Sequence, residues 1–434
     1  MTEKMKPSGI AWIGDIPQDW ECKRFRFCGD VQYGYPFNSD YFSSEETGFP
    51  LIRIRDITSG EIATYYEGTY PDEYIVKSGD VLVGMDGDFN VRVWANCDAL
   101  LNQRCCRVLD SQQINKRFMA YYLPHYLKVI NDLTWSTTVK HLLADDINNI
   151  YVAYPQMCEQ QAIADFLDTQ CAKIDSIIAD IEKQIETLQK YKKSLITEAV
   201  TKGLDRSVPM KESGIVWIGN VPEHWHLKRL KFMLENSSDS MKVGPFGSAL
   251  SGSDFTDEGK WVYNQRVVLD KNFSENTTFI SEEKYREMQG FSVYPGDILI
   301  TTRGTIGKVA IVPEGAQEGI LHPCIIKFRV DKEMMMPELL ELIFNESDFV
   351  KDQFTLMSNA TTIEVIYSYS LKDIILPVIP AEEQKKIYSY LSEKCETIDA
   401  VIMEKHKALS AITQHKKSLI YEYVTGKKRV TEVN

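Results

Sequence analysis

The sequence KPSGIAWIGDIPQDWECKRFRF at residues 6–27 returns in related form as KESGIVWIGNVPEHWHLKRLKF at residues 211–232. These two stretches, which we call the leading segments, are identical at 12 of 22 positions with a constant offset of 205. A second repeat pairs residues 160–201 with residues 384–425 at an offset of 224. Its last ten residues, KKSLITEAVT and KKSLIYEYVT, agree at 8 of 10 positions. Such self-similarity indicates a tandem duplication.

Each copy runs in the same order: a leading segment, a long middle and a helical tail. The middles, about residues 28–150 and 233–375, hardly resemble each other. Because the offset rises from 205 to 224, the second middle is longer by 19 residues. We therefore expect a duplicated frame that holds two different inserts, with globular domains at residues 1–155 and 204–380 and helical regions at residues 156–203 and 381–434.

Both tails carry seam residues with alternating spacings of four and three, the pattern of a coiled coil. The register continues through five consecutive heptad-like steps in each copy, which favours a paired coiled coil over two independent surface helices. A lysine stands at the same seam position of both tails, where it costs stability but can select register and direction. The seam positions are Leu167, Cys171, Ile174, Ile178, Ile181, Ile185, Leu188, Lys192, Leu195 and Ala199 in the first tail, and Leu391, Cys395, Ile398, Ile402, Lys405, Leu409, Ile412, Lys416, Leu419 and Tyr423 in the second.

The ends of these helices are also marked in the sequence. Pro380 is followed by Glu382 and Glu383, which put carboxylates at the positive end of the second helix. Gly203 and Gly426 stand where a left-handed cap would end each helix. The two tails are therefore predicted to be long helices with defined stops.

The middles read as short strands and turns. Apolar and polar residues alternate at residues 51–55, 79–83, 296–300 and 324–330, and Gly, Asn and Asp gather between such runs. These patterns predict mixed α+β globular domains with irregular loops. The fold class is thus α+β, with two globular domains joined by two long helices.

Composition narrows the possible functions. The nine cysteines include no C-x2-C pair and the seven histidines form no cluster, so we expect neither a metal site nor a disulfide frame. The longest apolar runs fall far short of the roughly 18 residues of a membrane span, and the first twenty residues lack a signal-type apolar core. We expect a cytoplasmic protein.

No catalytic motif is recognisable. Asp86-Gly87-Asp88-Phe89-Asn90 begins like a calcium loop, but the sixth position is Val91 and the twelfth is Cys97. Gly304-Thr305-Ile306-Gly307-Lys308 resembles a phosphate loop but does not fit its spacing. We therefore predict that the chain is not an enzyme and holds no cofactor of its own.

The duplication suggests recognition instead. Two unlike modules on a shared rod can read two unlike half-sites, as dimeric DNA readers do. A helix from residue 160 to 200 would be about 60 Å long at about 1.5 Å per residue. That length can hold two modules about one duplex turn apart, roughly 34–36 Å.

Several motifs together resemble one family. Two of them are the SGI-x-WIG-x-(I/V)P-x-x-W segments and the Gly-Asp-(V/I)-Leu strands with the turns that follow them. The others are the Leu101-Asn102-Gln103-Arg104 segment and the start of each tail, where a Pro precedes Glu-Gln-x-x-Ile. In this order and in duplicate they closely resemble the specificity subunit of type I restriction-modification enzymes. The resemblance covers nearly the whole chain.

The resemblance implies two target-recognition domains, each binding one part of a split double-stranded DNA sequence. It also implies that the two helical regions pair antiparallel with an approximate twofold relation and dock two modification (methyltransferase) subunits. Restriction (endonuclease/translocase) subunits would be added for cleavage. S-adenosylmethionine and ATP would then belong to those partners.

The net charge of −13 argues against strong DNA binding by the chain alone, because phosphate contacts supply most sequence-independent affinity. We expect partner subunits to provide much of the clamp on DNA while this chain reads bases. Two other hypotheses remain. One is a protein–protein scaffold with a coiled-coil spacer and no DNA binding, and the other is an enzyme without a recognisable motif.

Candidate base-reading residues are polar side chains in the turn-rich parts of the middles, since Arg can pair with guanine and Asn or Gln with adenine. Each could instead be a solvated strand residue or a turn-stabilising side chain. Gly34 and Phe37, with Gly244 and Phe246, are expected either to shape an early turn near the binding face or to have a purely structural role. The candidates are Tyr35, Asn38, Arg53, Arg55, Asn90, Arg92, Asn102, Gln103 and Arg104 in the first domain, and Ser248, Asn264, Gln265, Arg266, Arg303, Thr305 and Lys308 in the second.

The tryptophans of the leading segments, Trp12, Trp20, Trp217 and Trp225, could stack on bases. Because they recur in two copies with different inserts, they are predicted to pack the leading segment against its own domain.

Overall fold

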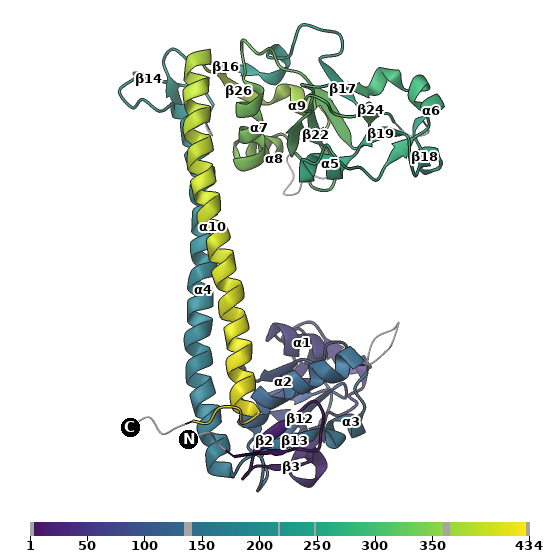
Figure 1. Cartoon of the computed structure of the whole chain (residues 1–434), viewed down its shortest axis with the longest axis vertical. Helices are drawn as coiled ribbons and strands as arrows, with labels where there is room; N and C mark the ends of the chain where they lie inside the picture. Colours follow the sequence, from purple (N-terminus) through teal and green to yellow (C-terminus); the bar gives the residue numbers. More distant parts are fainter. Residues whose placement is uncertain (1–3, 134–140, 216–217, 247–248, 359–364, 431–434) are drawn as a thin grey trace. The chain divides into compact units, whose positions relative to one another are not determined.

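A computed structural model describes residues 4–133, 141–215, 218–246, 249–358 and 365–430. The chain divides into two compact units, Met1–Ile181 with Lys407–Asn434, and Glu182–His406. Each unit holds one globular module and parts of two long helices, α4 (Met157–Lys202) and α10 (Ala381–Val424) (Figure 1). We call residues 4–154 module 1 and residues 210–378 module 2.

The leading segments form the same structure in both modules. Each begins with an antiparallel hairpin, β1 with β2 or β14 with β15, and continues into a strand that pairs with the last strand before a long helix. Thus β3 pairs with β13 and β16 pairs with β26, both antiparallel. The start and the end of each insert are therefore tied together. The bounds are β1 Met5–Pro7, β2 Asp15–Pro17, β3 Glu21–Arg24, β13 Tyr151–Tyr154, β14 Met210–Glu212, β15 Asn220–Pro222, β16 His226–Arg229 and β26 Ile375–Val378.

The insert of module 1 forms two sheets. One has the strand order β10-β9-β12-β4 and the other has the order β5-β7-β6-β11-β8. Helices α1, α2 and α3 complete the module. The bounds are β4 Asp30–Tyr33, β5 Phe42–Ser43, β6 Phe49–Ile52, α1 Ile54–Ser59, β7 Tyr65–Tyr66, β8 Ile75–Val76, β9 Val81–Gly84, β10 Val91–Val93, β11 Ala99–Leu101, β12 Cys105–Leu109, α2 Lys116–Leu133 and α3 Ala144–Asn149.

The insert of module 2 repeats this topology although its sequence differs. Its sheets have the orders β17-β25-β22-β23 and β18-β20-β19-β24-β21, which match those of module 1 strand for strand. Helix α6 is an addition, and α7 and α8 take the place of α2. The bounds are β17 Met241–Val243, β18 Phe255–Thr256, β19 Lys260–Tyr263, α5 Gln265–Asp270, β20 Phe279–Ile280, α6 Glu282–Glu287, β21 Ser292–Val293, β22 Ile298–Thr301, β23 Val309–Ile311, β24 Gly319–Leu321, β25 Ile325–Phe328, α7 Pro337–Glu346, α8 Phe349–Ser358 and α9 Ser368–Asp373.

The core of each module includes a tryptophan of the leading segment. Trp20 and Trp225 are both fully buried, Trp20 against Phe118 and Trp225 within the cluster around Leu339. Their predicted packing role is confirmed. Trp12 is half exposed and its indole donates a hydrogen bond to the Tyr126 hydroxyl. Trp217 lies outside the described residues.

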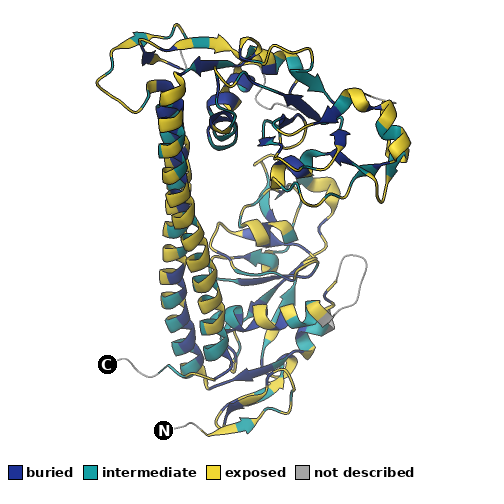
Figure 2. Cartoon of the chain, turned by 45° about the horizontal axis from the view of Figure 1, so that its top comes forward, coloured by how far each residue is buried: buried dark blue, intermediate teal, exposed yellow. Residues whose placement is uncertain are grey.

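The long helices pack together as the seam pattern predicts, and every predicted seam position is buried or partly buried. Figure 2 shows exposed residues along the outer faces of both helices. Within the second unit the Lys192 Nζ lies 2.7 Å from a carboxylate oxygen of Asp399, and within the first unit Lys416 lies 2.6 Å from Asp175. Higher numbers on one helix meet lower numbers on the other, so the helices run antiparallel. The expected α+β class with two paired helices is confirmed.

The predicted helix stops are also confirmed. Gly203 directly follows the last residue of α4 and has a φ of 73°. Gly426 lies two residues after the end of α10 and has a φ of 71°. Gln160 and its repeat counterpart Gln384 fasten each helix start to its module. Each side-chain amide donates to two backbone carbonyl oxygens and its oxygen accepts a backbone N–H. Among the described residues, none of the helices combines the length and the apolar character that a bilayer-spanning segment needs.

Candidate nucleic-acid interface

In module 1, two parallel strands bring predicted base-reading residues together. Strands β6 and β11 pair in parallel, with Leu51 opposite Leu100 and Ile52 opposite Leu101. Arg53 follows β6 directly and Asn102 follows β11 directly. Because the carboxyl ends of adjacent parallel strands lie at one edge, both side chains emerge at the same place.

A cavity of about 400 Å³ lies at this edge. Five of the nine candidates of module 1 line it, together with aromatic and acidic neighbours. Arg53 lies over the Phe42 ring at 5.9 Å, a cation–π distance that leaves its guanidinium hydrogen-bonding edge available. The lining residues are Phe37, Ser39, Phe42, Arg53, Ile54, Arg55, Asp86, Asn102, Gln103 and Arg104.

Asp86 supplies the acidic side of this cavity. Its Oδ1 lies 2.6 Å from His141 Nδ1 and 3.9 Å from the nearest Arg104 nitrogen. A carboxylate can accept a hydrogen bond from the cytosine amino group, while guanidinium groups suit guanine. The cavity therefore offers positively charged hydrogen-bond donors and a negatively charged hydrogen-bond acceptor, and base edges can pair with both.

The other candidates of module 1 make local contacts. Tyr35 borders the site, since its backbone N–H donates to Leu101 O at 2.9 Å and it bridges Asn102. Asn38 accepts the Asp40 N–H and so stabilises a turn. Arg92 donates to the carbonyl oxygens at the end of α1, and Asn90 donates to Thr58 Oγ1 there. Asn90 and Arg92 thus hold α1 in place.

Arg55 is hydrogen-bonded within the module and is also exposed at the cavity. Its guanidinium donates to Thr64 Oγ1 at 2.7 Å and to Ala63 O at 3.2 Å, while its side chain remains 56% exposed at the cavity. Its position is therefore fixed by the protein before any ligand arrives.

Module 2 has the same strand arrangement with different side chains. Strands β19 and β24 pair in parallel and lead into Asn264 and His322. Asn264 caps α5, because its side-chain oxygen accepts the N–H groups of Arg266 and Val267. His322 occupies the place that Asn102 takes in module 1, and burial lowers its pKa, which favours the neutral imidazole.

The turn from β22 to β23 lies beside the start of α5 in module 2. Gln265 donates from Nε2 to Thr305 O at 3.2 Å, so the first turn of α5 and this turn are joined. Arg303 forms an isolated bridge with Val365, which fastens the turn to the segment before α9. Arg266 is exposed and pairs only weakly with Asp270 at 3.2 Å. Gln265, Arg303 and Thr305 are thus brought together.

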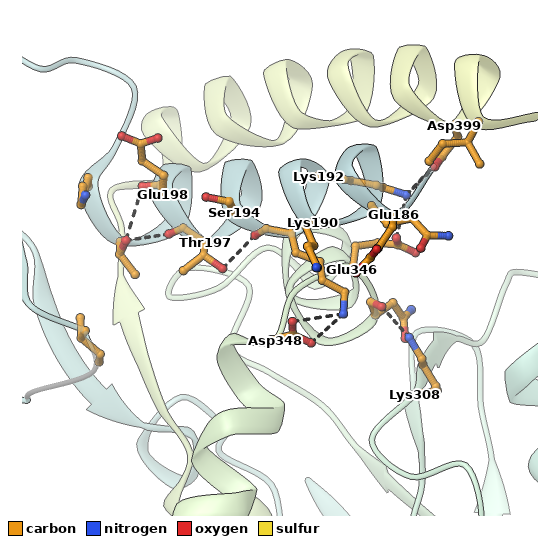
Figure 3. A pocket seen from close by; sticks show the side chains of 17 residues that line it. Glu186, Lys190, Lys192, Ser194, Thr197, Glu198, Lys308, Glu346, Asp348 and Asp399 are labelled. Carbon is orange, nitrogen blue, oxygen red and sulfur yellow. Dashed lines mark hydrogen bonds and ion pairs between the residues drawn. The ribbon is translucent and has the colours of Figure 1, made fainter. Parts of the chain in front are cut away.

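Lys308 and Ser248 stand apart from this group. Lys308 lines a cavity of about 1060 Å³ beside α4, and its Nζ donates to Asn345 O at 2.5 Å (Figure 3). Burial lowers the pKa of Lys308. The cavity lining mixes lysines with carboxylates such as Glu346 and Asp348, so it lacks the positive excess expected of a phosphate site. Ser248 lies outside the described residues.

Sequence reasoning missed Asp86, His141 and His322. Asp86 stands out in the sequence as the start of a calcium-like loop and as part of a turn after a strand, not as a base-reading residue, and His141 lies more than fifty residues away in the chain. His322 had one usable signal: Ala99-Leu100-Leu101-Asn102 and Gly319-Ile320-Leu321-His322 are both short apolar strands that end in a polar residue. Among the residues that the structure describes, no group of three His, Cys, Asp or Glu could hold a metal ion.

Comparisons with known proteins identify a matching family and several relatives. A family model described as "Type I restriction modification DNA specificity domain" matches residues 17–187 and 243–411. The chain is 29% identical over 406 residues to the EcoBI specificity subunit of Escherichia coli, covering 92% of this chain and 84% of that protein. It is 26% identical over 436 residues to the MjaVIII specificity subunit of Methanocaldococcus jannaschii, covering 96% and 95%.

The fold also matches a solved structure. A chain from work on complex assembly and conformational transition of the type I R-M system superposes with a TM-score of 0.68 at 14% identity. The match covers 95% of this chain and 99% of that chain. At this identity the similarity concerns the fold alone.

Proposed function

The chain belongs to the family of type I restriction-modification DNA specificity subunits, and from that premise we propose that its two modules each bind one part of a split DNA target. It is the DNA specificity subunit of a type I system and is itself non-catalytic. The scaffold and enzyme alternatives are thereby set aside.

One observation carries the proposal of a split target. The two modules share a sheet topology strand for strand, yet the residues after their central parallel strands differ: Arg53 and Asn102 in module 1, Asn264 and His322 in module 2. Equal scaffolds with unequal side chains at equivalent positions suit the reading of two unlike sequences.

The base-reading residues are proposed as two groups. In module 1 they are Arg53, Arg55, Asn102, Gln103 and Arg104, with Tyr35 at the border. In module 2 they are Gln265, Arg266, Arg303 and Thr305. We assign Asn38, Asn90, Arg92, Asn264 and Lys308 mainly to holding turns and helices, because their polar atoms are engaged within the protein.

The partners are proposed from the family. Two modification (methyltransferase) subunits would dock on the chain, and restriction (endonuclease/translocase) subunits would join for cleavage. S-adenosylmethionine and ATP would bind to these partners. We also propose that the chain works in the cytoplasm, where its DNA target would lie. Acidic residues outnumber basic residues in both modules, so partner subunits would supply much of the phosphate contact.

The test is a methylation map. The chain would be co-expressed with its modification subunit in a host that lacks similar methylation, and modified bases would be mapped across the genome. We expect one motif in two parts with a constant gap. A continuous motif, or no methylation from a complex that assembles and binds S-adenosylmethionine, would contradict the proposal.

A further inference from the structure

The residues that are identical in the two leading segments fall into two groups. Some are explained by the fold: Gly9 and Gly214 have positive φ, and the Ser8 and Ser213 hydroxyls hold the hairpin turns. Others have no such explanation. The last residue of both segments is a phenylalanine that points into solvent rather than into a core.

Phe27 and Phe232 have nearly the same environment. Each is the third residue of a short 3-10 helix, η1 (Phe25–Phe27) or η4 (Leu230–Phe232), whose first residue is buried. Phe27 is 64% exposed and Phe232 is 62% exposed. A cation lies over each ring: Arg26 at 5.0 Å from the Phe27 centroid and Lys231 at 5.2 Å from the Phe232 centroid.

An exposed phenylalanine costs the free chain solubility and gains nothing from burial. Its presence in the same pose in both copies, while the inserts diverged, calls for a function that is common to both modules. Base reading does not meet that condition, because it must differ between them. In module 1, β3 leads into η1 and lies at the end of the module that is far from α1 (Figure 1). In module 2, β16 leads into η4 and lies at the end that is far from α5.

We propose that Phe27 with Arg26, and Phe232 with Lys231, are twin docking points for two copies of one protein partner. This inference rests on the proposed function, in which that partner is the modification subunit. A duplicated surface in one chain fits a partner bound in two copies. The partner surface should offer an apolar pocket for the ring with carboxylates beside it for the cation.

The chemistry favours protein over DNA. Aromatic residues and arginine are enriched at protein interfaces, where a ring seated in a pocket often carries much of the binding energy. A phenylalanine contributes no phosphate contact. Lys231 also lies 3.5 Å from Asp373, so part of its charge is already balanced within the module.

The experiment uses the full chain and its modification subunit, with stoichiometry measured by native mass spectrometry and affinity by titration. We expect the wild-type chain to bind two modification subunits. Phe27→Ala and Phe232→Ala should each weaken one site about tenfold or more, and the double variant should weaken both. Tyr369→Ala is the control, because Tyr369 is 66% exposed but its repeat counterpart is Asp145.

Two further variants guard against misfolding. Arg26→Glu and Lys231→Glu leave both rings in place and should weaken the same sites, with thermal unfolding unchanged. Unaltered binding of two modification subunits by the double phenylalanine variant would overturn the inference, as would a loss confined to DNA affinity. If the wild-type chain did not bind the modification subunit at all, the proposed function itself would be wrong. That outcome differs from a failure of the docking inference, in which the wild-type chain and the double phenylalanine variant bind equally.

Discussion

Gly34 and Gly244 allow two backbone segments to meet beside the proposed reading sites. A Cβ atom at position 34 would lie 2.0 Å from Asn102 O, and one at position 244 would lie 2.1 Å from His322 O. No side chain can be accommodated at such distances. The expected role of these glycines in shaping a turn near the binding face therefore has a physical basis in this close approach.

Gly34→Ala should displace the Asn102 backbone and with it the turn that carries Gln103 and Arg104. We expect DNA affinity of the assembled complex to fall about tenfold or more, with a modest loss of stability from overpacking of about 1–3 kcal/mol. DNA binding by fluorescence anisotropy measures the first effect. Gly252→Ala, where a Cβ meets open space, should leave binding unchanged. Equal behaviour of the two variants would contradict the assignment.

Asp297 holds a buried ion pair in module 2. It is fully buried, its Oδ1 accepts a hydrogen bond from Arg329 at 2.5 Å, and its Oδ2 lies 3.4 Å from the buried Lys327 ammonium. Asp297→Ala removes the carboxylate that pairs with Arg329 and one of two carboxylates beside Lys327, the other being Asp239 at 2.7 Å. We expect it to destabilise module 2 by about 1–3 kcal/mol.

Thermal unfolding measures this loss. The matched control is Asp270→Ala, which removes an exposed partner of Arg266 and should cost about 0–1 kcal/mol. A similar shift in melting temperature for both variants would show that the buried pair does not stabilise the module.

At the scale of elements, a seam lysine joins three segments of the second unit. Lys192 lies 2.7 Å from Asp399 on α10 and 2.7 Å from Glu346 at the end of α7, and it points towards Asp399 in Figure 3. Burial opposes its charge, but the hydrogen bonds that Lys192 donates to the Asp399 and Glu346 carboxylates outweigh burial and raise the pKa of Lys192. The offset of 224 maps this pair onto Lys416 and Asp175.

Lys192→Glu places three carboxylates together and should destabilise the second unit by about 1–3 kcal/mol. Adding Asp399→Lys restores an attractive pair and should recover part of the loss. Lys190→Glu is the control, since Lys190 is exposed and pairs with Glu186 within one helix turn. Thermal unfolding distinguishes the variants. No recovery in the double variant would contradict a direct pair between the helices.

The sequence predicted the helices much better than the sheets. Seam spacing and terminal glycines are local signals, and α4 and α10 end where Gly203 and Gly426 predict. The strands are two to five residues long, and their partners lie far away in the chain: β6 pairs with β11 about fifty residues later. Such pairing depends on three-dimensional packing, which short alternating runs do not encode.

The site was predicted only in part for the same reason. Arg53 and Asn102 were selected by residue type, and their meeting at one strand edge required the parallel pairing. Arg92 and Asn264 looked equally suitable, but their polar groups are engaged at helix α1 and helix α5. His322 was missed because its equivalence to Asn102 lies in topology rather than in identity.

At the scale of the whole molecule, the two helices are proposed to set the distance between the half-sites. A heptad adds about 10 Å of helix, close to three base pairs of duplex. Removing one heptad from both α4 and α10, so that the seam stays in register, should shorten the tolerated gap or abolish assembly. Methylation mapping of the variant measures the gap. An unchanged gap would contradict a spacer role for the helices.

Each module is proposed to read its own half of the target, and the most direct test changes one module at a time. Asn102→Ala with Gln103→Ala alters module 1, and Gln265→Ala with Arg303→Ala alters module 2. Methylation would be mapped for each variant assembled with the modification subunit. We predict that each pair relaxes the bases of one half only, a different half for each module, and leaves the gap unchanged. Relaxation of the same half by both pairs, or of neither half, would contradict the account.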